Sequence, residues 1–298
     1  MFDDEQPFRF RGPDGLELTG HVWSGAESPR LPELLFSPGN GFPMQVYRPA
    51  LEGLPADAVV HAINHRGHGG SEVPGQLSDW DGLLADLRAY VEQRMHAPVI
   101  LAGHSMGSML ALRLAAEAPA LAAGLLLLEP PLHERRGKPR ATRTPEHEAF
   151  IERSRNRRDT WASREEAAAW FAGSVGYRQW SPEARAAFVA EGLVEAPDGS
   201  VRLATPPWLE AALYETVPQQ TVYQWAEQVR CPTVLLRGLE SWAAPAEVME
   251  DLADALPVAV VLPVPGTHTF PMEHPAETGH SVTKALRILR GETGLAAT

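Results

Sequence analysis

The stretch Val99-Ile100-Leu101-Ala102-Gly103-His104-Ser105-Met106-Gly107 decides the fold of this chain. An apolar run ends here at a serine between two glycines, and a helical pattern of apolar residues begins directly after it. Where a strand turns sharply into a helix, the serine backbone is strained, its neighbours two residues away must be small, and its hydroxyl stands above the sheet. The amide N–H groups that open the helix point toward the same place. The stretch therefore predicts that Ser105 is a nucleophile.

Apolar runs alternate with helical patterns on both sides of this stretch, which predicts a mostly parallel sheet with helices on both faces. A hairpin within residues 8–23 comes first, and further strands are expected at 34–36, 58–63, 99–102, 124–128, 233–236 and 258–262. Between them, from residue 132 to 227, the pattern is helical, charged and rich in tryptophan. We therefore expect a core of residues 1–131 and 228–298 and an inserted helical cap of residues 132–227, at the sheet edge where ligands bind.

Composition restricts the class of protein and its partners. The chain has 298 residues and is 44% hydrophobic, enough for a sizeable core, and its formal net charge of −12 argues against a nucleic-acid partner. A single cysteine, Cys231, excludes an intrachain disulfide and suits a reducing compartment. The acidic N-terminus lacks the apolar segment of a signal peptide, and no apolar run reaches membrane-spanning length. These features predict a cytoplasmic protein without a membrane partner.

A serine hydroxyl is a weak nucleophile at neutral pH and needs a base, which in turn needs an acid to orient it. His268 is the expected base, because it follows the last predicted strand in a glycine-containing loop. His104 flanks the serine, but adjacent residues at such a turn point apart. Two carboxylates follow strands and remain candidates for the acid, Glu129 and Glu240. We favour Glu129, which ends a run of four leucines where an unpaired carboxylate would be costly.

Negative charge that develops on a substrate oxygen needs two backbone donors. One expected donor is the N–H of Met106, directly after the serine. The other is expected from the loop Ser37-Pro38-Gly39-Asn40-Gly41-Phe42-Pro43, whose glycines allow the backbone to approach a ligand closely. Since Asn40 lies between two of these glycines, Asn40 and Met106 are predicted to form an oxyanion hole.

These motifs, in this order, resemble those of the α/β-hydrolase superfamily, in a branch with an inserted helical cap. The resemblance rests on the serine motif and on three further segments: Gly39-Asn40-Gly41-Phe42-Pro43, Asn64-His65-Arg66-Gly67-His68-Gly69-Gly70-Ser71 and Gly266-Thr267-His268. It covers the core and not the cap. It implies the α/β-hydrolase fold, with a mostly parallel eight-stranded sheet, helices on both faces and a helical cap inserted after the sixth strand. It also implies a serine hydrolase that needs no cofactor and no metal.

The chain departs from the superfamily pattern in two places. Pro38 stands where the loop usually begins with a histidine, which changes what supports the Asn40 donor. Ser241 stands where many members carry the acid, three residues after the glycine that ends the strand before the last one. Some relatives place the acid one strand earlier, at the position of Glu129. The resemblance therefore favours Glu129 and leaves Glu240 as a displaced alternative.

The predicted function is cleavage of a carboxylic ester or related acyl bond in a small-molecule substrate, through an acyl-enzyme intermediate, by a monomer or homodimer. A thioesterase or a carbon–carbon bond hydrolase of the diketone type would use the same machinery. The alternative from a different class is a non-catalytic member that binds a small ligand. Such a chain would be expected to lack Ser105 or His268, and this one has both.

Two other clusters have a simple and a functional interpretation. His61, His65 and His68 suggest a metal site, but no carboxylate or cysteine stands beside them at ligand spacing, so a structural loop is favoured. The cap also has a basic stretch, for which a solvated surface is favoured and a handle for an acidic substrate group is the alternative. Its residues are Arg135-Arg136-Gly137-Lys138-Pro139-Arg140, Arg153, Arg155, Arg157 and Arg158.

Overall fold

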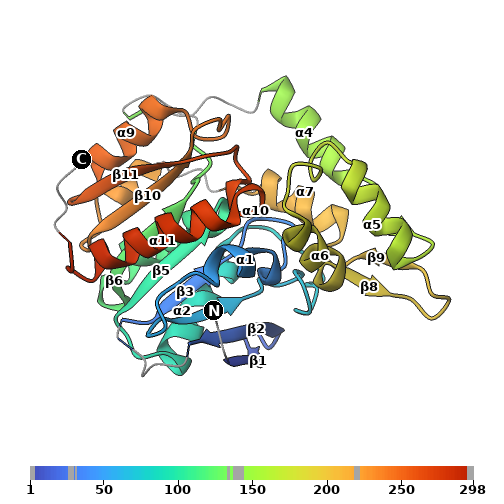
Figure 1. Cartoon of the computed structure of the whole chain (residues 1–298), viewed down its shortest axis with the longest axis horizontal. Helices are drawn as coiled ribbons and strands as arrows, with labels where there is room; N and C mark the ends of the chain where they lie inside the picture. Colours follow the sequence, from blue (N-terminus) through green and yellow to red (C-terminus); the bar gives the residue numbers. More distant parts are fainter. Residues whose placement is uncertain are drawn as a thin grey trace.

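The computed structural model describes residues 4–25, 30, 32–132, 135–136, 144–217 and 222–293. A large sheet with helices packed against it forms one part, and a smaller group of elements stands beyond one end of this sheet (Figure 1). The large sheet has the strand order β1-β2-β4-β3-β5-β6-β10-β11. In this order the strands are Asp4–Arg11, Glu17–Ser24, Val59–Ile63, Leu34–Ser37, Val99–His104, Ala122–Leu128, Thr233–Gly238 and Ala259–Val264.

All neighbouring strands of the large sheet are parallel except at β2, which runs antiparallel to both β1 and β4. The turn between β1 and β2 contains Gly15 with a φ of 91°, a backbone conformation that favours glycine. From β3 onward, the strands coincide with the apolar runs of the sequence, and helical segments separate them. The mostly parallel eight-stranded sheet predicted from this alternation is confirmed.

Alternate residues of the central strands point to opposite faces of the sheet, and each face has its own hydrophobic cluster. In β5, Leu101 belongs to one cluster and Ile100 to the other. The Leu101 face is covered by α2 (Asp81–Arg94), α3 (Met106–Glu117), α8 (Val222–Ala226) and α9 (Ala246–Ala255). The Ile100 face is covered by α1 (Arg48–Leu51) and α11 (Pro275–Leu289). The short helices η1 (Met44–Tyr47), η2 (Pro119–Leu121) and α10 (Phe270–Glu273) lie in the connections.

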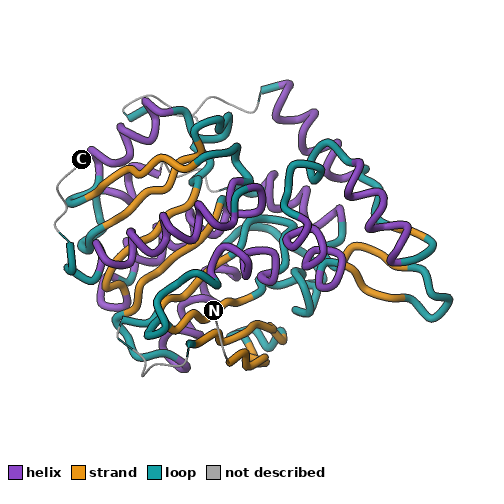
Figure 2. Tube along the Cα trace, viewed as in Figure 1, coloured by secondary structure: helices purple, strands orange, loops and turns teal. Residues whose placement is uncertain are grey.

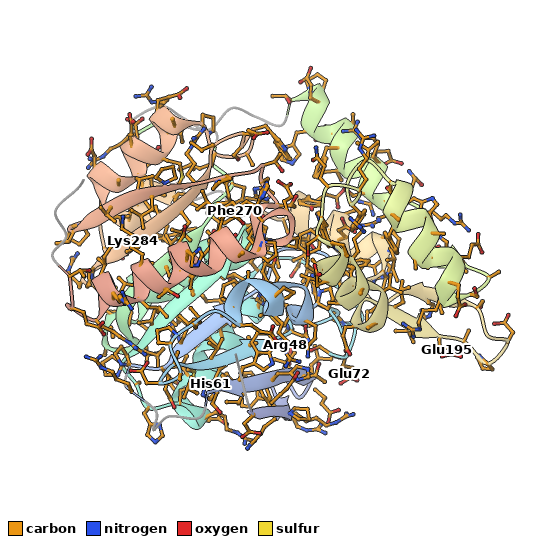
Figure 3. All side chains as sticks on the ribbon, viewed as in Figure 1. Arg48, His61, Glu72, Glu195, Phe270 and Lys284 are labelled. Atoms are coloured by element: carbon orange, nitrogen blue, oxygen red, sulfur yellow. The ribbon has the colours of Figure 1, made fainter. Side chains whose placement is uncertain are left out.

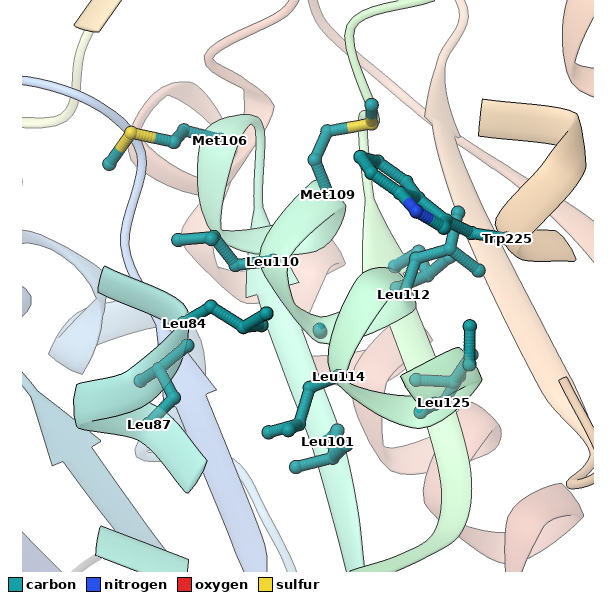
Figure 4. Packing of buried hydrophobic residues seen from close by; sticks show 14 of the residues in the cluster. Leu84, Leu87, Leu101, Met106, Met109, Leu110, Leu112, Leu114, Leu125 and Trp225 are labelled. Carbon is teal, nitrogen blue, oxygen red and sulfur yellow. The ribbon is translucent and has the colours of Figure 1, made fainter. Parts of the chain in front are cut away.

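Helix α3 is buried along most of its length within the first cluster. Leu110, Leu112 and Leu114 are each 0% exposed, and Leu84 of α2 and Leu125 of β6 lie around them (Figure 4). Truncating one leucine at such a position typically costs about 2–5 kcal/mol. This packing holds the N-terminus of α3, and the turn before it, in a fixed place at the carboxyl edge of the sheet.

The chain leaves the sheet after β6 and returns to it at β10, and all the elements between them except α8 form the smaller group (Figure 2). We call this group the insertion. Its helices are α4 (Pro145–Arg155), α5 (Arg164–Gly173), α6 (Pro182–Glu191) and α7 (Pro207–Glu215). It also has a small sheet in the order β7-β9-β8, with strands Thr160–Trp161, Val201–Leu203 and Leu193–Glu195. Glu195 lies near the end of the molecule that is farthest from Lys284 of α11 (Figure 3).

This small sheet differs from the purely helical pattern expected for residues 132–227. The signal for it is the turn Pro197-Asp198-Gly199-Ser200 between two short runs with branched apolar residues. Gly199 has a φ of 83° in this turn. Helix α8, near the end of the same range, packs against α3 and α9 of the large sheet. The division into a core of residues 1–131 and 228–298 and a cap of residues 132–227 stays a prediction.

Aromatic side chains of the insertion pack mainly against one another. Phe171 and Phe188 are each 1% exposed, with ring centroids 4.9 Å apart, and Trp180 is 2% exposed beside them. Trp180 also meets Phe42, in the loop after β3, at 5.3 Å between ring centroids. The insertion therefore has a core of its own and reaches the loops of the large sheet. Within the described ranges, no helix has the combined length and apolar character that crossing a bilayer requires.

Candidate active site

Ser105 occupies the turn between β5 and α3, with φ 53° and ψ −119°. Glycine is required two residues before and two residues after Ser105, because other backbone atoms lie too close for a side chain there. A Cβ on Gly103 would lie 2.3 Å from the carbonyl carbon of Gly107, and a Cβ on Gly107 would lie 2.1 Å from the carbonyl oxygen of Ser37. Met106 begins α3, so its N–H has no acceptor within the helix. The turn thus holds a half-buried serine hydroxyl next to an amide that has no acceptor among the described residues.

His268 follows β11 and lies directly beside the serine. Its Nε2 atom is 3.0 Å from Ser105 Oγ. The loop that carries His268 is braced by Glu273, whose carboxylate accepts a hydrogen bond from the Thr267 N–H at 2.8 Å. Gly238, at the end of β10, allows this loop to approach, because a Cβ there would lie 2.6 Å from the carbonyl oxygen of Thr267. The base predicted from the sequence and the predicted nucleophile are therefore within hydrogen-bond distance.

Glu129, directly after β6, lies on the other side of the imidazole. Its Oε2 atom is 3.4 Å from His268 Nδ1, and the residue is 0% exposed. The carboxylate also accepts hydrogen bonds from the Gly238 N–H and the Ser241 hydroxyl, both at 2.5 Å. Both carboxylate oxygens therefore have donors, as a buried carboxylate requires. The alternative acid, Glu240, is exposed, and it is Glu129 that meets the His268 ring.

Ser105 and Glu129 share a backbone feature found at no other non-glycine residue of the described chain. Both have a positive φ, 53° for Ser105 and 49° for Glu129. Such a conformation costs on the order of 1–3 kcal/mol and persists only where the surrounding structure imposes it. Strain of this kind concentrates at functional sites. The two residues that the sequence singled out as nucleophile and preferred acid are thus also the strained ones.

The loop after β3 surrounds Asn40 with amides that are already in use. The Gly39 N–H donates to the Tyr47 hydroxyl and the Gly41 N–H donates to His68 Nε2, each at 2.9 Å. The Asn40 N–H donates to no group in the part of the chain that the structure describes. An unused amide between two satisfied ones is available for a ligand.

His104 turns away from Ser105, as expected, and links two loops of the site. Its Nε2 donates to the carbonyl oxygen of His268 at 2.8 Å, so its Nδ1 is the acceptor for the Tyr47 hydroxyl at 2.9 Å. The Tyr47 oxygen in turn accepts the Gly39 N–H. Burial, with a smaller contribution from His268, lowers the pKa of His104 to about 3, so the ring is neutral near pH 7. The sequence did not indicate the contact between Tyr47 and His104, because that contact depends on the tertiary fold.

Glu210 of α7 connects the insertion to the loop after β3. Its backbone carbonyl accepts a hydrogen bond from the Asn40 side-chain amide at 2.9 Å. Its carboxylate receives Arg157 at 2.7 Å, and Arg157 also donates to the Tyr177 hydroxyl at 2.6 Å. Burial raises the pKa of Glu210, an effect that Arg157 opposes. A largely buried ion pair therefore lies next to the loop that holds Asn40.

The three clustered histidines have hydrogen-bond partners of ordinary kinds. His61 Nδ1 is 2.9 Å from the Tyr90 hydroxyl, and His65 Nε2 is 2.8 Å from the Ser37 hydroxyl. His68 supports the loop after β3 through its Nε2 atom. No group of three or more metal-binding side chains occurs among the residues that the structure describes. His65 and His68 thus act as supports for the neighbouring loop.

Five arginines of the basic stretch form ion pairs with carboxylates. The pairs are Arg135–Asp251, Arg136–Glu227 at 2.8 Å, Arg155–Glu215 at 2.6 Å, Arg157–Glu210 at 2.7 Å and Arg158–Glu166 at 2.6 Å. Residues 137–143 lie outside the described ranges. These five guanidinium groups already have carboxylate partners within the protein. The ion pairs therefore favour a structural role for these arginines over the binding of an acidic substrate group.

Comparison with known sequences gives one broad match and two short ones. Residues 34–279 match the model of the Alpha/beta hydrolase family. Monoglyceride lipase of Homo sapiens is 38% identical over 79 residues, which are 25% of this chain and 26% of the lipase. Monoglyceride lipase of Mus musculus is 36% identical over 85 residues, 27% of each chain. The chain thus matches only about a quarter of the length of these curated relatives.

Comparison with solved structures gives matches over nearly the whole chain. E-2-(acetamidomethylene)succinate hydrolase has a TM-score of 0.75 at 20% identity, covering 95% of this chain and 99% of that one. The peroxisomal alpha-beta-hydrolase Lpx1 of Saccharomyces cerevisiae has a TM-score of 0.76 at 20% identity, covering 99% of this chain and 91% of that one. These similarities confirm the expected α/β-hydrolase fold. Because the family match extends from β3 into α11, the chain belongs to the alpha/beta hydrolase family.

Proposed function

We propose that the protein is a serine hydrolase that cleaves a carboxylic ester or a closely related acyl bond. The observation that carries this proposal is the continuous hydrogen-bond sequence from Ser105 Oγ through the His268 imidazole to Glu129, at 3.0 Å and 3.4 Å. Membership of a hydrolase family supports hydrolysis as the chemistry. The strained backbone of Ser105 and Glu129 supports these residues as members of the triad.

In the proposed acylation step, Ser105 Oγ attacks the carbonyl carbon of the substrate while His268 Nε2 takes the hydroxyl proton. Glu129 orients the imidazole and stabilises its positive charge. The carbonyl oxygen becomes an oxyanion, for which the N–H groups of Asn40 and Met106 are the proposed donors. The N-terminus of α3 adds a favourable dipole at the same place. The tetrahedral intermediate then breaks its bond to the leaving group, which takes the proton from His268 Nε2.

Deacylation uses the same groups with water as the nucleophile. His268 removes a proton from water, which attacks the acyl carbon attached to Ser105. The second tetrahedral intermediate expels Ser105 Oγ, which regains its proton from His268, and the carboxylic acid is released. None of these steps requires a metal or a cofactor.

We further propose that residues 132–227 act as a cap over this site and determine substrate choice. Two contacts support this role: the Asn40 side chain bonds to Glu210 of the insertion, and Phe42 meets Trp180. Both Asn40 and Phe42 belong to the loop that supplies a proposed oxyanion donor. A change in the insertion can therefore reach the reacting atoms through this loop.

A fluorophosphonate probe and a panel of esters test the proposal on four proteins: wild type, Ser105→Ala, Glu129→Gln and Glu240→Gln. Ser105→Ala should lose both labelling and turnover. Glu129→Gln should lower kcat by about 10³–10⁴-fold, because the imidazole loses its orientation. Glu240→Gln is the matched control and should stay close to wild type, since its side chain is exposed.

Three outcomes would change the proposal. Labelling that persists in Ser105→Ala would remove the nucleophile assignment. A larger loss in Glu240→Gln than in Glu129→Gln would move the acid. A thioester or a diketone turned over faster than an oxygen ester with the same acyl group would select one of the alternative reactions, and a wild-type protein that neither labels nor turns over would favour a ligand-binding role.

A further inference from the structure

Trp242 is an exposed aromatic residue beside the proposed base. It lies in the loop between β10 and α9 and is 64% exposed, and its ring centroid is 5.7 Å from that of His268. Tryptophan has the largest apolar surface to gain from contact with a ligand. Leu239 in the same loop is 58% exposed. The loop thus presents apolar surface to solvent at the edge of the proposed site.

Of the groups around the His268 imidazole, the Trp242 ring lies on the side that faces solvent. The two ring nitrogens face Ser105 and Glu129. The His104 ring, with its centroid 5.0 Å away, is 0% exposed and belongs to the interior. Trp242 is therefore the ring neighbour of His268 that an arriving substrate can touch.

The proposed proton transfer determines where the alcohol part and the acyl part of an ester lie in the site. The leaving oxygen must lie within hydrogen-bond reach of His268 Nε2, because this atom gives it a proton. The acyl carbon is bonded to Ser105. The alcohol part therefore extends from the histidine side of the site, where the Trp242 ring stands.

From this geometry we infer that Trp242 is a specificity-determining residue that contacts the alcohol part of the substrate. The preferred alcohols are apolar, either aromatic or aliphatic. The exposed carboxylate of Glu240, two residues before Trp242, adds a reason for the loop to disfavour anionic alcohols. The inference rests on the proposed function, since it needs Ser105 and His268 to act as described.

The test keeps the acyl group constant and changes the alcohol. Methyl, butyl and benzyl butanoate all give the same acyl-enzyme, so differences in kcat/KM report the acylation step. Trp242→Ala should lower kcat/KM about tenfold for the butyl and benzyl esters, at the lower end of what one lost apolar contact is worth, and less than about twofold for the methyl ester. Trp242→Phe should retain most of the preference. Val258→Ala, at an exposed apolar residue directly before β11 and thus at the opposite end of this strand from His268, is the control and should leave the preference unchanged.

An equal fall for all three alcohols in Trp242→Ala would overturn the inference, because it would indicate a general effect on His268. Discrimination that instead follows acyl length in a series of methyl esters would place Trp242 on the acyl side and would also overturn it. Ser105→Ala separates this failure from failure of the proposed function. If Ser105→Ala abolishes turnover while Trp242→Ala shows no alcohol discrimination, only the inference fails; if Ser105→Ala remains active, the proposed function fails.

Discussion

Replacing Ser241 with alanine should disturb the orientation of the Glu129 carboxylate while leaving the carboxylate itself in place. The Ser241 hydroxyl oxygen accepts hydrogen bonds from the N–H groups of Ala243 at 3.2 Å and Ala244 at 3.3 Å. Its single proton is therefore directed to Glu129 Oε2, at 2.5 Å. This is the same carboxylate oxygen that lies 3.4 Å from His268 Nδ1. The hydroxyl thus fixes the atom through which the acid meets the imidazole.

The expected magnitude follows from burial and charge. A hydrogen bond to a charged group is worth about 1.5–3 kcal/mol, and Glu129, at 0% exposure, cannot recruit water in exchange without moving. Ser241→Ala should therefore lower the free energy of unfolding by about 2 kcal/mol. Because the carboxylate loses one of its holding groups, kcat should fall by about tenfold, while KM changes little since Ser241 has no proposed contact with substrate.

Urea unfolding and steady-state kinetics on a short-chain ester measure both effects, and Ser241→Thr, which keeps the hydroxyl, is the control. An alanine variant within about 0.5 kcal/mol and twofold of wild type would refute the reasoning. A second variant sharpens the test. An aspartate at position 241 reaches further than a serine, toward the place that Glu129→Ala would vacate. We expect Glu129→Ala/Ser241→Asp to be at least tenfold more active than Glu129→Ala, which a purely structural role for position 241 would not produce.

Three further perturbations have expected outcomes. Gly107→Ala should abolish activity and lower the yield of folded protein, because its Cβ would lie 2.1 Å from the carbonyl oxygen of Ser37; activity within tenfold of wild type would contradict the close approach. Arg157→Leu should lower the free energy of unfolding by about 3–5 kcal/mol in urea titrations, because it leaves the buried Glu210 carboxylate without its partner, and the double replacement Arg157→Leu/Glu210→Leu should recover most of this loss. The pKa of His104 is about 3 in the folded protein, below its ordinary value of 6.5, so the unfolded chain binds a proton that the folded one does not, and stability should fall as pH drops below about 6.5. By pH 5 the loss should be about 1–2 kcal/mol, measured as a difference in pH dependence between wild type and His104→Gln, and parallel curves would refute it.

The features that could be predicted from the sequence are those in which local spacing and backbone geometry agree. Gly103 and Gly107 stand two residues from Ser105 because a larger side chain at either position would meet backbone atoms. The preference for Glu129 came from a carboxylate that ends an apolar run, and the structure shows that carboxylate buried with donors on both oxygens. Alternation of apolar runs and helical patterns predicted a mostly parallel sheet, since central strands such as β5 and β6 are buried on both faces.

The features that could not be predicted depend on segments distant in sequence. Tyr47 and His104 form a hydrogen bond at the edge of the sheet, and no sequence motif links two residues that lie 57 positions apart. Ser241 was recognised only as unable to serve as the acid, whereas its hydroxyl bonds to the acid from the neighbouring strand. The small sheet of the insertion could not be predicted because its strands are only two or three residues long. Alternation of apolar and polar residues can be recognised only over about four residues or more.

The positive φ of Ser105 and Glu129 affects the balance between the stability of the fold and the proposed activity. Glycine adopts such a conformation without strain, so glycine at either position would be expected to relieve strain that the wild-type residue carries while removing a group that the proposed chemistry requires. Glu129→Gly should accordingly unfold at a higher temperature than Glu129→Ala and be no more active. At these two positions, therefore, the stability of the fold and the proposed chemistry oppose each other.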